Sequence, residues 1–356
     1  MTAGEAVAII VVLAITAYAC SGIPDFGAGF WDLTAGGRRG GRAARALIDE
    51  AITPVWEANH VWLIYILVVS WTAFGAAFGD IMTTLFVPFI LAALGIVLRG
   101  ANFALRKDAA RAGGRHLAAW MFGVASIITP FFFGTALGAI MAGRVPSNGH
   151  GNPASSWWNA TSITVGVLTV AVSAFLAAVY LVRESDRRGL PELHDYFRNR
   201  AAVAGIVGLL AGIAAAFALH SDSLGMFHRF VHRSIPLLAV GVVALAITFV
   251  MALRGRTRGI RIPAIIGVAA LVWSWGVAQY PYLLPFSMTI ASGEGASQSL
   301  HWLLIWFIVA LVTVVPLLVL LYVLDQRGEL GEDPTTSRPE HSPHPHAGTP
   351  AIDQHK

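Results

Sequence analysis

Charge and cysteine are both scarce in this sequence. Charged residues make up 12% of the 356 residues, whereas hydrophobic residues make up 56%. Soluble domains carry about a quarter charged residues, so this balance excludes an ordinary soluble domain and predicts a polytopic membrane protein. The single cysteine, Cys20, excludes an internal disulfide and a thiolate metal cluster.

The small net charge of +4 does not indicate nucleic-acid binding, because nearly all basic residues are arginines in short connections between apolar segments. The sequence contains no phosphate-binding glycine loop, no zinc-type ligand spacing and no nucleophile triad. The apolar run 6–20 has no Lys or Arg before it. We therefore expect it to remain as a membrane helix and not to be cleaved as a signal peptide.

Nine apolar segments follow one another along the chain, each near the ~20 residues that cross a bilayer as a helix. A turn at Gly79-Asp80 would make the second and third antiparallel neighbours. We expect an all-α polytopic transmembrane bundle of nine spans within residues 1–325, followed by a disordered cytoplasmic tail at 326–356. The segments are approximately Ala6–Gly22, Trp56–Gly75, Ile81–Leu98, Leu117–Ala142, Ala160–Val182, Ala201–Leu219, Ile235–Leu253, Pro263–Leu284 and Leu303–Leu324.

Basic residues alternate between the connections and predict the orientation. Odd connections carry four or five each, whereas even ones carry none, one, two and none. Because Lys and Arg concentrate in cytoplasmic loops, the N-terminus is expected outside and the C-terminus in the cytoplasm. Arg99, which closes the third span, is expected to reach the cytoplasmic surface. The basic residues of the odd connections are Arg38, Arg39, Arg42, Arg45; Arg99, Arg106, Lys107, Arg111, Arg115; Arg183, Arg187, Arg188, Arg198, Arg200; and Arg254, Arg256, Arg258, Arg261.

The second segment begins with polar groups in its first turns, after Pro54, which suits a helix start. Glu57 and His60 share one helix face, while Asn59 and Trp62 lie towards the other. A charge at a helix centre in lipid costs roughly 2.5–3.5 kcal/mol on insertion scales, so such groups point to a function. A carboxylate beside an imidazole at the cytoplasmic end of a span predicts a mouth for protons.

Asp25, just after the first segment, lies at about the same depth and is a second candidate for this proton pathway. Each residue also has a structural interpretation. Glu57 would be favoured at a helix N-terminus by roughly 0.3–1 kcal/mol without any proton role. His60 could relay a proton or hydrogen-bond Glu57, and Asp25 could cap a helix or turn.

Three further residues of the second segment are expected to support the fold. Trp56 and Trp62 are expected to anchor the interface or fill the bundle. Asn59 is expected to hydrogen-bond backbone or a neighbouring helix. Before this segment, Leu47, Ile48, Ala51 and Ile52 recur at helical spacing and predict a short helix lying in the membrane interface.

These features resemble subunit II of the cytochrome bd-type quinol oxidases, including the cyanide-insensitive branch. In one departure, Ser21 stands where the family's first helix commonly has an Asp, so Asp25 matches only the second Asp of that motif. Three stretches carry the resemblance: Pro54-Val55-Trp56-Glu57-Ala58-Asn59-His60-Val61-Trp62-Leu63, Leu98-Arg99-Gly100-Ala101-Asn102-Phe103, and Trp275-Gly276-Val277-Ala278-Gln279-Tyr280-Pro281-Tyr282-Leu283-Leu284-Pro285.

The resemblance implies a heterodimer in the cell (inner) membrane. The larger subunit I would hold the haems, of types b and d, and the quinol site, and would reduce oxygen to water. This chain would be its structural twin, with two four-helix bundles plus one helix and no haem. It would stabilise subunit I and admit cytoplasmic protons through Glu57. Some members also hold a structural quinone in this subunit, and a small accessory subunit is a further expected partner.

The residues themselves also argue against haem or another metal in this chain. Most of the twelve histidines fall in loops or the tail, and no deep facing pair of haem ligands is evident. No residue is therefore assigned to catalysis or to a metal, and no cofactor-binding residue is identified. Two other functions stay open at this point: a proton-coupled secondary transporter using Glu57 and Asp25, and a purely structural or assembly subunit.

Overall fold

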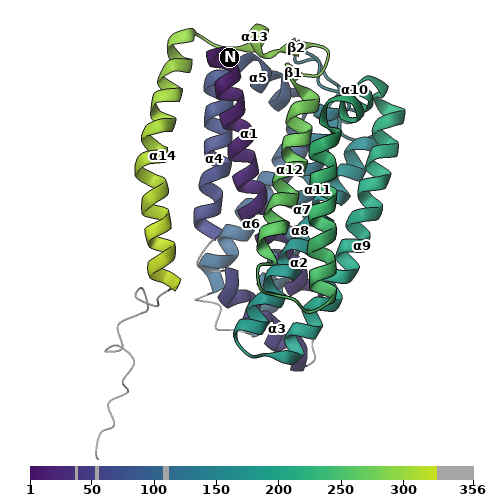
Figure 1. The fold of residues 1–356 in the computed structure, drawn as a ribbon, viewed down its shortest axis with the longest axis vertical. Helices are drawn as coiled ribbons and strands as arrows, with labels where there is room; N and C mark the ends of the chain where they lie inside the picture. Colours follow the sequence, from purple (N-terminus) through teal and green to yellow (C-terminus); the bar gives the residue numbers. More distant parts are fainter. Residues whose placement is uncertain (37–38, 53–55, 107–111, 327–356) are drawn as a thin grey trace, which may run out of the picture. The chain divides into compact units, whose positions relative to one another are not determined.

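The computed structural model describes residues 1–36, 39–52, 56–106 and 112–326, and Figure 1 shows that helices dominate them. The chain divides into two compact units, Met1–Leu304 and Ile305–Lys356. The second unit consists, in its described part, of the continuation of one long helix. All packing discussed below lies within the first unit. The predicted tail at 326–356 lies outside the described residues except for Gln326.

The described part contains helices, one π-helical turn and one two-stranded antiparallel hairpin. The first half of the chain contains α1 (Ala3–Ser21), α2 (Ile23–Thr34), α3 (Arg39–Ile52), α4 (Trp56–Ala73), α5 (Gly75–Thr84), α6 (Phe86–Arg106) and α7 (Ala112–Met141). The second half contains α8 (Ala160–Arg187), α9 (Pro191–Asp222), α10 (Leu224–Arg229), the π-helix η1 (Phe230–Ser234), α11 (Ile235–Leu253), α12 (Arg261–Gln279), β1 (Tyr282–Leu284), β2 (Met288–Thr289), α13 (Ile290–Gly293) and α14 (Ser297–Gln326).

Each of the nine predicted apolar segments contains helix. By length and composition, seven helical segments of the described chain are able to cross a membrane, and an eighth is added if the bent pair Asn59–Ala73 and Gly75–Thr84 counts as one span. Phe86–Asn102 is a shorter apolar helix. The coarser prediction, a mostly helical polytopic membrane protein, is confirmed. The count of nine crossings and the orientation of the termini stay predictions.

The first helical segment is longer than predicted. Helix continues from α1 through Gly22 into α2, so that Ala3–Thr34 forms one continuous candidate span. Gly22 keeps right-handed helical torsion angles (φ −84°, ψ −39°), and its N–H donates to the Tyr18 carbonyl at 2.7 Å. Pro24 lies at the start of α2, where its missing N–H is tolerated. Asp25 therefore lies inside a helix and not in a connection after it.

The predicted turn at Gly79-Asp80 is wrong, because both residues lie inside α5. The chain turns instead at Phe74, where α4 and α5 meet at 118°, and again near Leu85. Phe74 and Leu85 are both buried in apolar surroundings. Burial of these large side chains fixes the two corners, whereas the small residues around Gly79 continue the helix.

The eighth predicted segment ends early, because α12 stops at Gln279 and the chain enters the β1–β2 hairpin. Two arginines from the segment between α9 and α11 bind the carbonyls there. The Nε of Arg229 donates to the Ala278 carbonyl at 2.7 Å, and Nη1 of Arg233 donates to the Tyr280 carbonyl at 3.0 Å. Cations stabilise a helix C-terminus, which explains why two arginines stand in a connection otherwise poor in charge.

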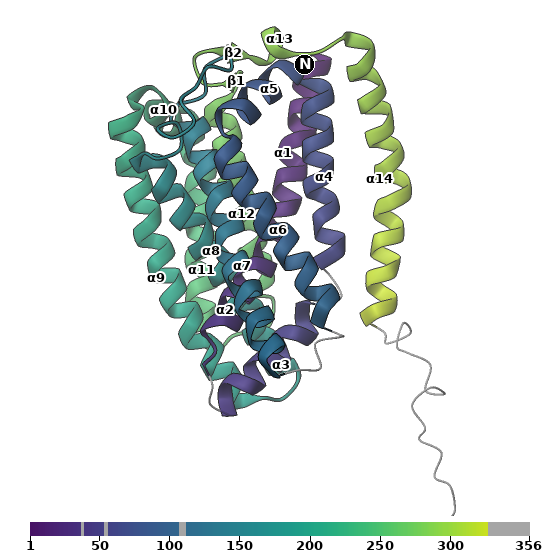
Figure 2. The same ribbon diagram turned by 180° about the vertical axis from the view of Figure 1, so that it is seen from behind.

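The two ends of the first unit have separate apolar cores. One core joins α2, α3, α8, α9 and α12, and the other joins α1, α4, α5, α7 and the hairpin. Figures 1 and 2 place α2 and α3 at one end and the N-terminus, the hairpin and α10 at the other. The predicted helix at 47–52 exists as part of α3, but Leu47 and Ile48 are buried against protein rather than facing lipid.

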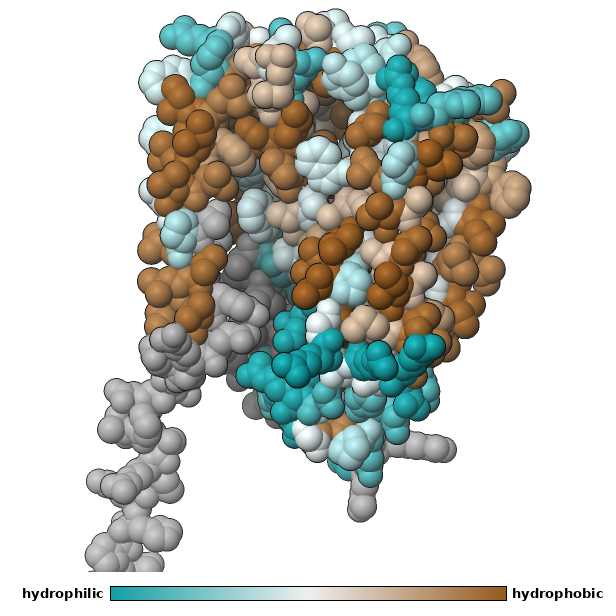
Figure 3. Space-filling view, viewed as in Figure 1, coloured by the Kyte–Doolittle hydropathy of each residue, from teal (hydrophilic) through white to brown (hydrophobic). Residues whose placement is uncertain are grey.

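Hydrophilic side chains gather at the end of the molecule that α3 and the α8–α9 and α11–α12 connections form, and a broad hydrophobic surface lies beside them (Figure 3). The described parts of the connections with many arginines share this end (Figures 1 and 2). Their common location is what the alternating charge pattern requires. We refer to it below as the arginine-rich end.

Candidate functional site

Helix α2 is held against α8 by direct contacts between backbone and side chains. The hydroxyl of Ser173 donates to the Ile23 carbonyl at 2.6 Å, and Nε1 of Trp31 donates to the Ala174 carbonyl at 2.8 Å. A Cβ at Gly27 would lie 1.9 Å from the Ser173 carbonyl oxygen, so only glycine permits this approach. The tight packing turns the first residues of α2, Asp25 among them, into the interior of the bundle.

Two of the predicted site residues meet in this interior. Asp25 is only 6% exposed, and Asn59 of α4 is also buried. The Nδ2 of Asn59 donates to Oδ2 of Asp25 at 2.5 Å and to the Ser21 carbonyl at 3.0 Å. The prediction that Asn59 hydrogen-bonds a neighbouring helix is confirmed. A buried carboxylate needs such donors, because burial without them is strongly unfavourable.

Arg99 completes the site, and the prediction that it reaches the surface is wrong. This residue of α6 is 1% exposed, and its Nη2 donates to the backbone carbonyl of Asp25 at 2.9 Å. Its guanidinium also lies over two aromatic rings, 4.6 Å from the Phe26 centroid and 5.1 Å from the Phe122 centroid. The carbonyl, the rings and the nearby carboxylate compensate for its lost hydration. In the sequence, the signal for a buried arginine was its position directly after an apolar run.

Several buried polar atoms around Arg99 have no hydrogen-bond partner within the part of the chain that the structure describes. They are Nε and Nη1 of Arg99, both amide atoms of Asn102 one turn later on α6, and the hydroxyl of Tyr18. Buried polar groups in native proteins are nearly always paired with protein or with ordered water. The site therefore has the chemistry to hold internal water beside a carboxylate.

The other predicted residues of the proton pathway are placed less completely. The ring of His60 is half-buried, with its centroid 6.3 Å from that of Phe26. Trp62 is also half-buried. Trp56 and Glu57 are the first two residues of α4, but their side chains lie outside the described residues, as do Pro54 and Val55 altogether. The role of Glu57 stays a prediction.

A second buried carboxylate on α2 was not predicted. Asp32 lies seven residues after Asp25, which places both on the same helix face, and it is 1% exposed. Nε of Arg45 on α3 lies 3.6 Å from its Oδ1. This contact joins α3 to α2 at the arginine-rich end and gives Asp32 a cationic partner.

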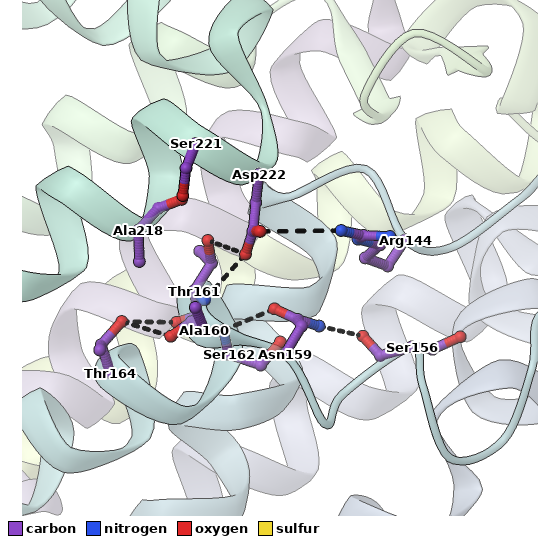
Figure 4. Close-up of polar contacts among 10 residues, drawn as sticks. All are labelled: Arg144, Ser156, Asn159, Ala160, Thr161, Ser162, Thr164, Ala218, Ser221 and Asp222. Atoms are coloured by element: carbon purple, nitrogen blue, oxygen red, sulfur yellow. Dashed lines mark hydrogen bonds and ion pairs between the residues drawn. The ribbon is translucent and has the colours of Figure 1, made fainter.

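A third acidic group, Asp222, closes α9 at the opposite end (Figure 4). Its Oδ2 accepts hydrogen bonds from the backbone N–H of Thr161 at 3.0 Å and from the Thr161 hydroxyl at 2.7 Å. Nη2 of Arg144 lies 3.8 Å from its Oδ1. Because Thr161 lies in the first turn of α8, Asp222 supplies an anion to a helix N-terminus.

Among the described residues, no group of three or more His, Cys, Asp or Glu side chains could hold a metal ion. Two histidines do lie side by side. The rings of His228 and His232 stack with centroids 5.8 Å apart, and both side chains are exposed on α10 and η1. They lie on neighbouring turns of the helical segment Leu224–Leu253, so they do not face each other across the bundle.

The fold and this site define a polytopic helical membrane protein with a carboxylate and an arginine buried together in its interior. The family model of cytochrome bd terminal oxidase subunit II matches residues 4–325. The chain therefore belongs to the cytochrome bd terminal oxidase subunit II family, and the resemblance inferred from the motifs is confirmed. Membership makes it a multi-pass protein of the cell membrane and one component of an oxidase complex that includes a subunit I.

Individual relatives agree with the family assignment. The chain is 23% identical over 313 residues to the cytochrome bd-I ubiquinol oxidase subunit 2 of Escherichia coli (strain K12), covering 76% of this chain and 81% of that protein. It is 21% identical over 315 residues to a putative cytochrome bd menaquinol oxidase subunit II of Bacillus subtilis (strain 168), covering 84% and 88%. The bd oxidase structure from Geobacillus thermodenitrificans has the same fold, with a TM-score of 0.75, 21% identity and coverage of 91% and 98%.

Proposed function

We propose that this chain is the haem-free subunit II of a membrane-bound quinol:oxygen oxidoreductase. In this proposal it stabilises the haem-bearing subunit I and supplies cytoplasmic protons for the reduction of oxygen to water. Family membership supports the complex, and the names of the relatives, a ubiquinol and a putative menaquinol oxidase subunit, support a quinol as electron donor. The isolated chain carries no assigned catalytic residue. The redox chemistry belongs to the partner.

The buried contact between Asp25 and Asn59 is the observation that carries the proton role. A carboxylate can accept hydrogen bonds at about four positions. Among the described residues, one donor binds the Asp25 carboxylate, namely Nδ2 of Asn59. The remaining positions are free to accept water or a proton. The adjacent polar atoms of Arg99 and Asn102 provide partners for such water.

The proposed route begins at the arginine-rich end, which the positive-inside pattern assigns to the cytoplasm. Glu57 is the second residue of α4, two residues before Asn59. Glu57 would receive a proton at the surface and pass it through water to Asp25. His60, the residue after Asn59, would lie close to this route. The buried positive charge of Arg99 lies beside Asp25 and would favour the deprotonated form of the Asp25 side chain. The proton would therefore leave again towards the partner.

The haems b and d belong to subunit I in this proposal. A structural quinone and a small accessory subunit remain further expectations from the family. Turnover would then consume protons from one side of the membrane and build a gradient without pumping.

Substitution of the two acids tests the proton role. We expect D25N and E57Q each to slow quinol-dependent oxygen consumption, D25N by about tenfold or more, since a positioned proton-transfer group contributes roughly 10²–10⁴-fold to the step it serves. The measurement is turnover and proton uptake of the assembled complex in proteoliposomes. D32N is the matched control, because Asp32 is buried on the same helix face but has Arg45 beside it. Unchanged turnover and proton uptake in D25N and E57Q would remove the proton role.

A purely structural role is the second candidate, because the same contacts join α2, α4 and α6 through buried polar groups. It predicts that D25N lowers the melting temperature of the complex while the turnover of the surviving complex stays normal. The transporter interpretation has no such support, since the family consists of oxidase subunits.

A further inference from the structure

An apolar cavity of 260 Å³ opens on the side of the bundle between α2, α7, α8 and α9. Every residue that lines it is hydrophobic, among them Phe30, Trp31, Phe131, Val167 and Val203. It opens to the exterior, because Val203 is 60% exposed and Val167 41%. Water has no hydrogen-bond partner in such a space, so hydrocarbon is the natural filling within a membrane.

An arginine that has no acidic partner among the described residues lies beside this cavity. Arg200 lies on α9 one turn before Val203, and its guanidinium lies over the rings of Tyr196, at 3.4 Å from the centroid, and Trp31, at 5.5 Å. Trp31 thus contacts the arginine and also lines the cavity. Nε of Arg200 is buried with no hydrogen-bond partner among the residues described by the structure.

The neighbouring arginines differ from Arg200 in this respect. Nε of Arg188 lies 2.7 Å from a carboxylate oxygen of Glu184, and Nη1 of Arg198 lies 3.1 Å from one of Asp195. No carboxylate of the described chain forms an ion pair with Arg200. Aromatic rings hold its guanidinium in place, but they do not use its planar set of N–H donors, which suits a phosphate.

The depth of Arg200 in the membrane fits a lipid headgroup. It is the last charged residue before the apolar run Ala201–Leu219, and it lies towards the arginine-rich end. An arginine at such a boundary places its charge at the level of the phosphates while its neighbours face the acyl chains. The apolar cavity therefore begins where a headgroup bound to Arg200 would end.

We propose that this surface binds one anionic phospholipid, with its phosphate at the guanidinium of Arg200 and an acyl chain in the cavity between α2, α7, α8 and α9. A neutral quinone would fill the cavity equally well but would leave the unpartnered cation without a counter-charge. The site is separate from the Asp25 site and does not depend on a proton role for this chain.

The test uses the whole oxidase complex, exchanged into vesicles of equal parts phosphatidylglycerol and phosphatidylcholine and then re-extracted in detergent. Retained lipid is counted by mass spectrometry. We expect wild type to retain phosphatidylglycerol in preference to phosphatidylcholine. In R200Q this preference should fall about fivefold, the factor that corresponds to about 1 kcal/mol of attraction per basic residue. R198Q is the matched control on the same helix and should retain the lipid as wild type does.

A second variant tests the cavity independently of charge. V203F projects a larger side chain into the opening from an exposed position, so the fold should be kept; the visible spectrum and melting temperature of the complex verify this. We expect V203F to lower phosphatidylglycerol retention with Arg200 intact. Three results would each overturn the proposal. Wild type could retain the two lipids equally, R200Q and V203F could both retain phosphatidylglycerol as wild type does, or the two variants could lose a bound quinone and no lipid.

Discussion

Asp25 and Asp222 are both aspartates that bind a neighbouring helix, yet their surroundings differ. The carboxylate of Asp222 accepts two hydrogen bonds from Thr161 and has Arg144 nearby. Among the described residues, the Asp25 carboxylate accepts one hydrogen bond, from Asn59, although it is more deeply buried than Asp222. The arginine beside it donates to the Asp25 backbone and not, in the described contacts, to the carboxylate.

This difference separates a structural carboxylate from one that retains acceptor positions. Asp222 stabilises the start of α8, where exposed N–H groups and the helix dipole favour an anion. Its hydrogen bonds fix its position. Near Asp25 lie buried polar atoms that have no hydrogen-bond partner in the described part of the chain, an unfavourable arrangement unless water or a function accounts for it.

Removal of Arg99 should have the largest effect on stability. R99M leaves the buried Asp25 without its neighbouring cation, and breaking such a buried pair by removing one partner costs about 3–5 kcal/mol. We expect poor assembly of the complex, or a strongly lowered melting temperature. The measurement is the yield and thermal unfolding of the purified complex.

The double variant R99M/D25N is the control for this interpretation. If the damage arises from an uncompensated carboxylate, neutralising it should restore part of the lost stability. A double variant that is less stable than R99M by the full effect of D25N alone would show instead that the two groups act independently.

Loss of the Asp222 carboxylate should have an intermediate effect, on stability alone. D222A leaves the N–H and hydroxyl of the buried Thr161 unpaired, at a cost of about 1–3 kcal/mol. D222N keeps an acceptor oxygen and should lie between wild type and D222A. We expect the melting temperature to fall in this order while turnover per assembled complex stays unchanged. A turnover defect in D222N as large as that in D25N would abolish the distinction between the two aspartates.

Much of the fold followed from the sequence because membrane helices carry a strong local signal. Apolar runs of about 20 residues located helix in all nine segments, and the arginine pattern grouped the connections at one end. The errors came from residues that usually end helices. Gly22 suggested the end of the first segment and Gly79-Asp80 suggested a turn, but the chain is helical through both places.

The site was only half predictable for a different reason. Asp25 and Asn59 each carried a signal, as polar groups in apolar surroundings. Their contact joins residues far apart in sequence and depends on how α2 and α4 pack. Arg99 was misjudged because an arginine at a span end ordinarily reaches water, and only the tertiary structure shows that it points inward.

The smallest expected effect on stability concerns another carboxylate, that of Glu5, which lies at the same end as Asp222. The Tyr280 hydroxyl donates to Glu5 Oε1 at 2.8 Å, and this hydrogen bond, together with the negative charge of Glu5, raises the pKa of Tyr280 above its ordinary value. A raised tyrosine pKa contributes stability that is fully present below the unfolded-state value, about 10, and is lost as pH rises through the folded-state value.

We therefore expect the melting temperature of Y280F to lie slightly below that of wild type by a constant amount up to about pH 10, with the difference shrinking at higher pH. The effect should be small, because Tyr280 is half-exposed and solvent weakens the interaction. E5Q keeps an acceptor but removes the charge, so it should reduce the alkaline dependence. If wild type and Y280F differ equally at all pH values, the contact acts through packing alone. Glu5 would then differ from Asp222, whose carboxylate accepts two hydrogen bonds from Thr161.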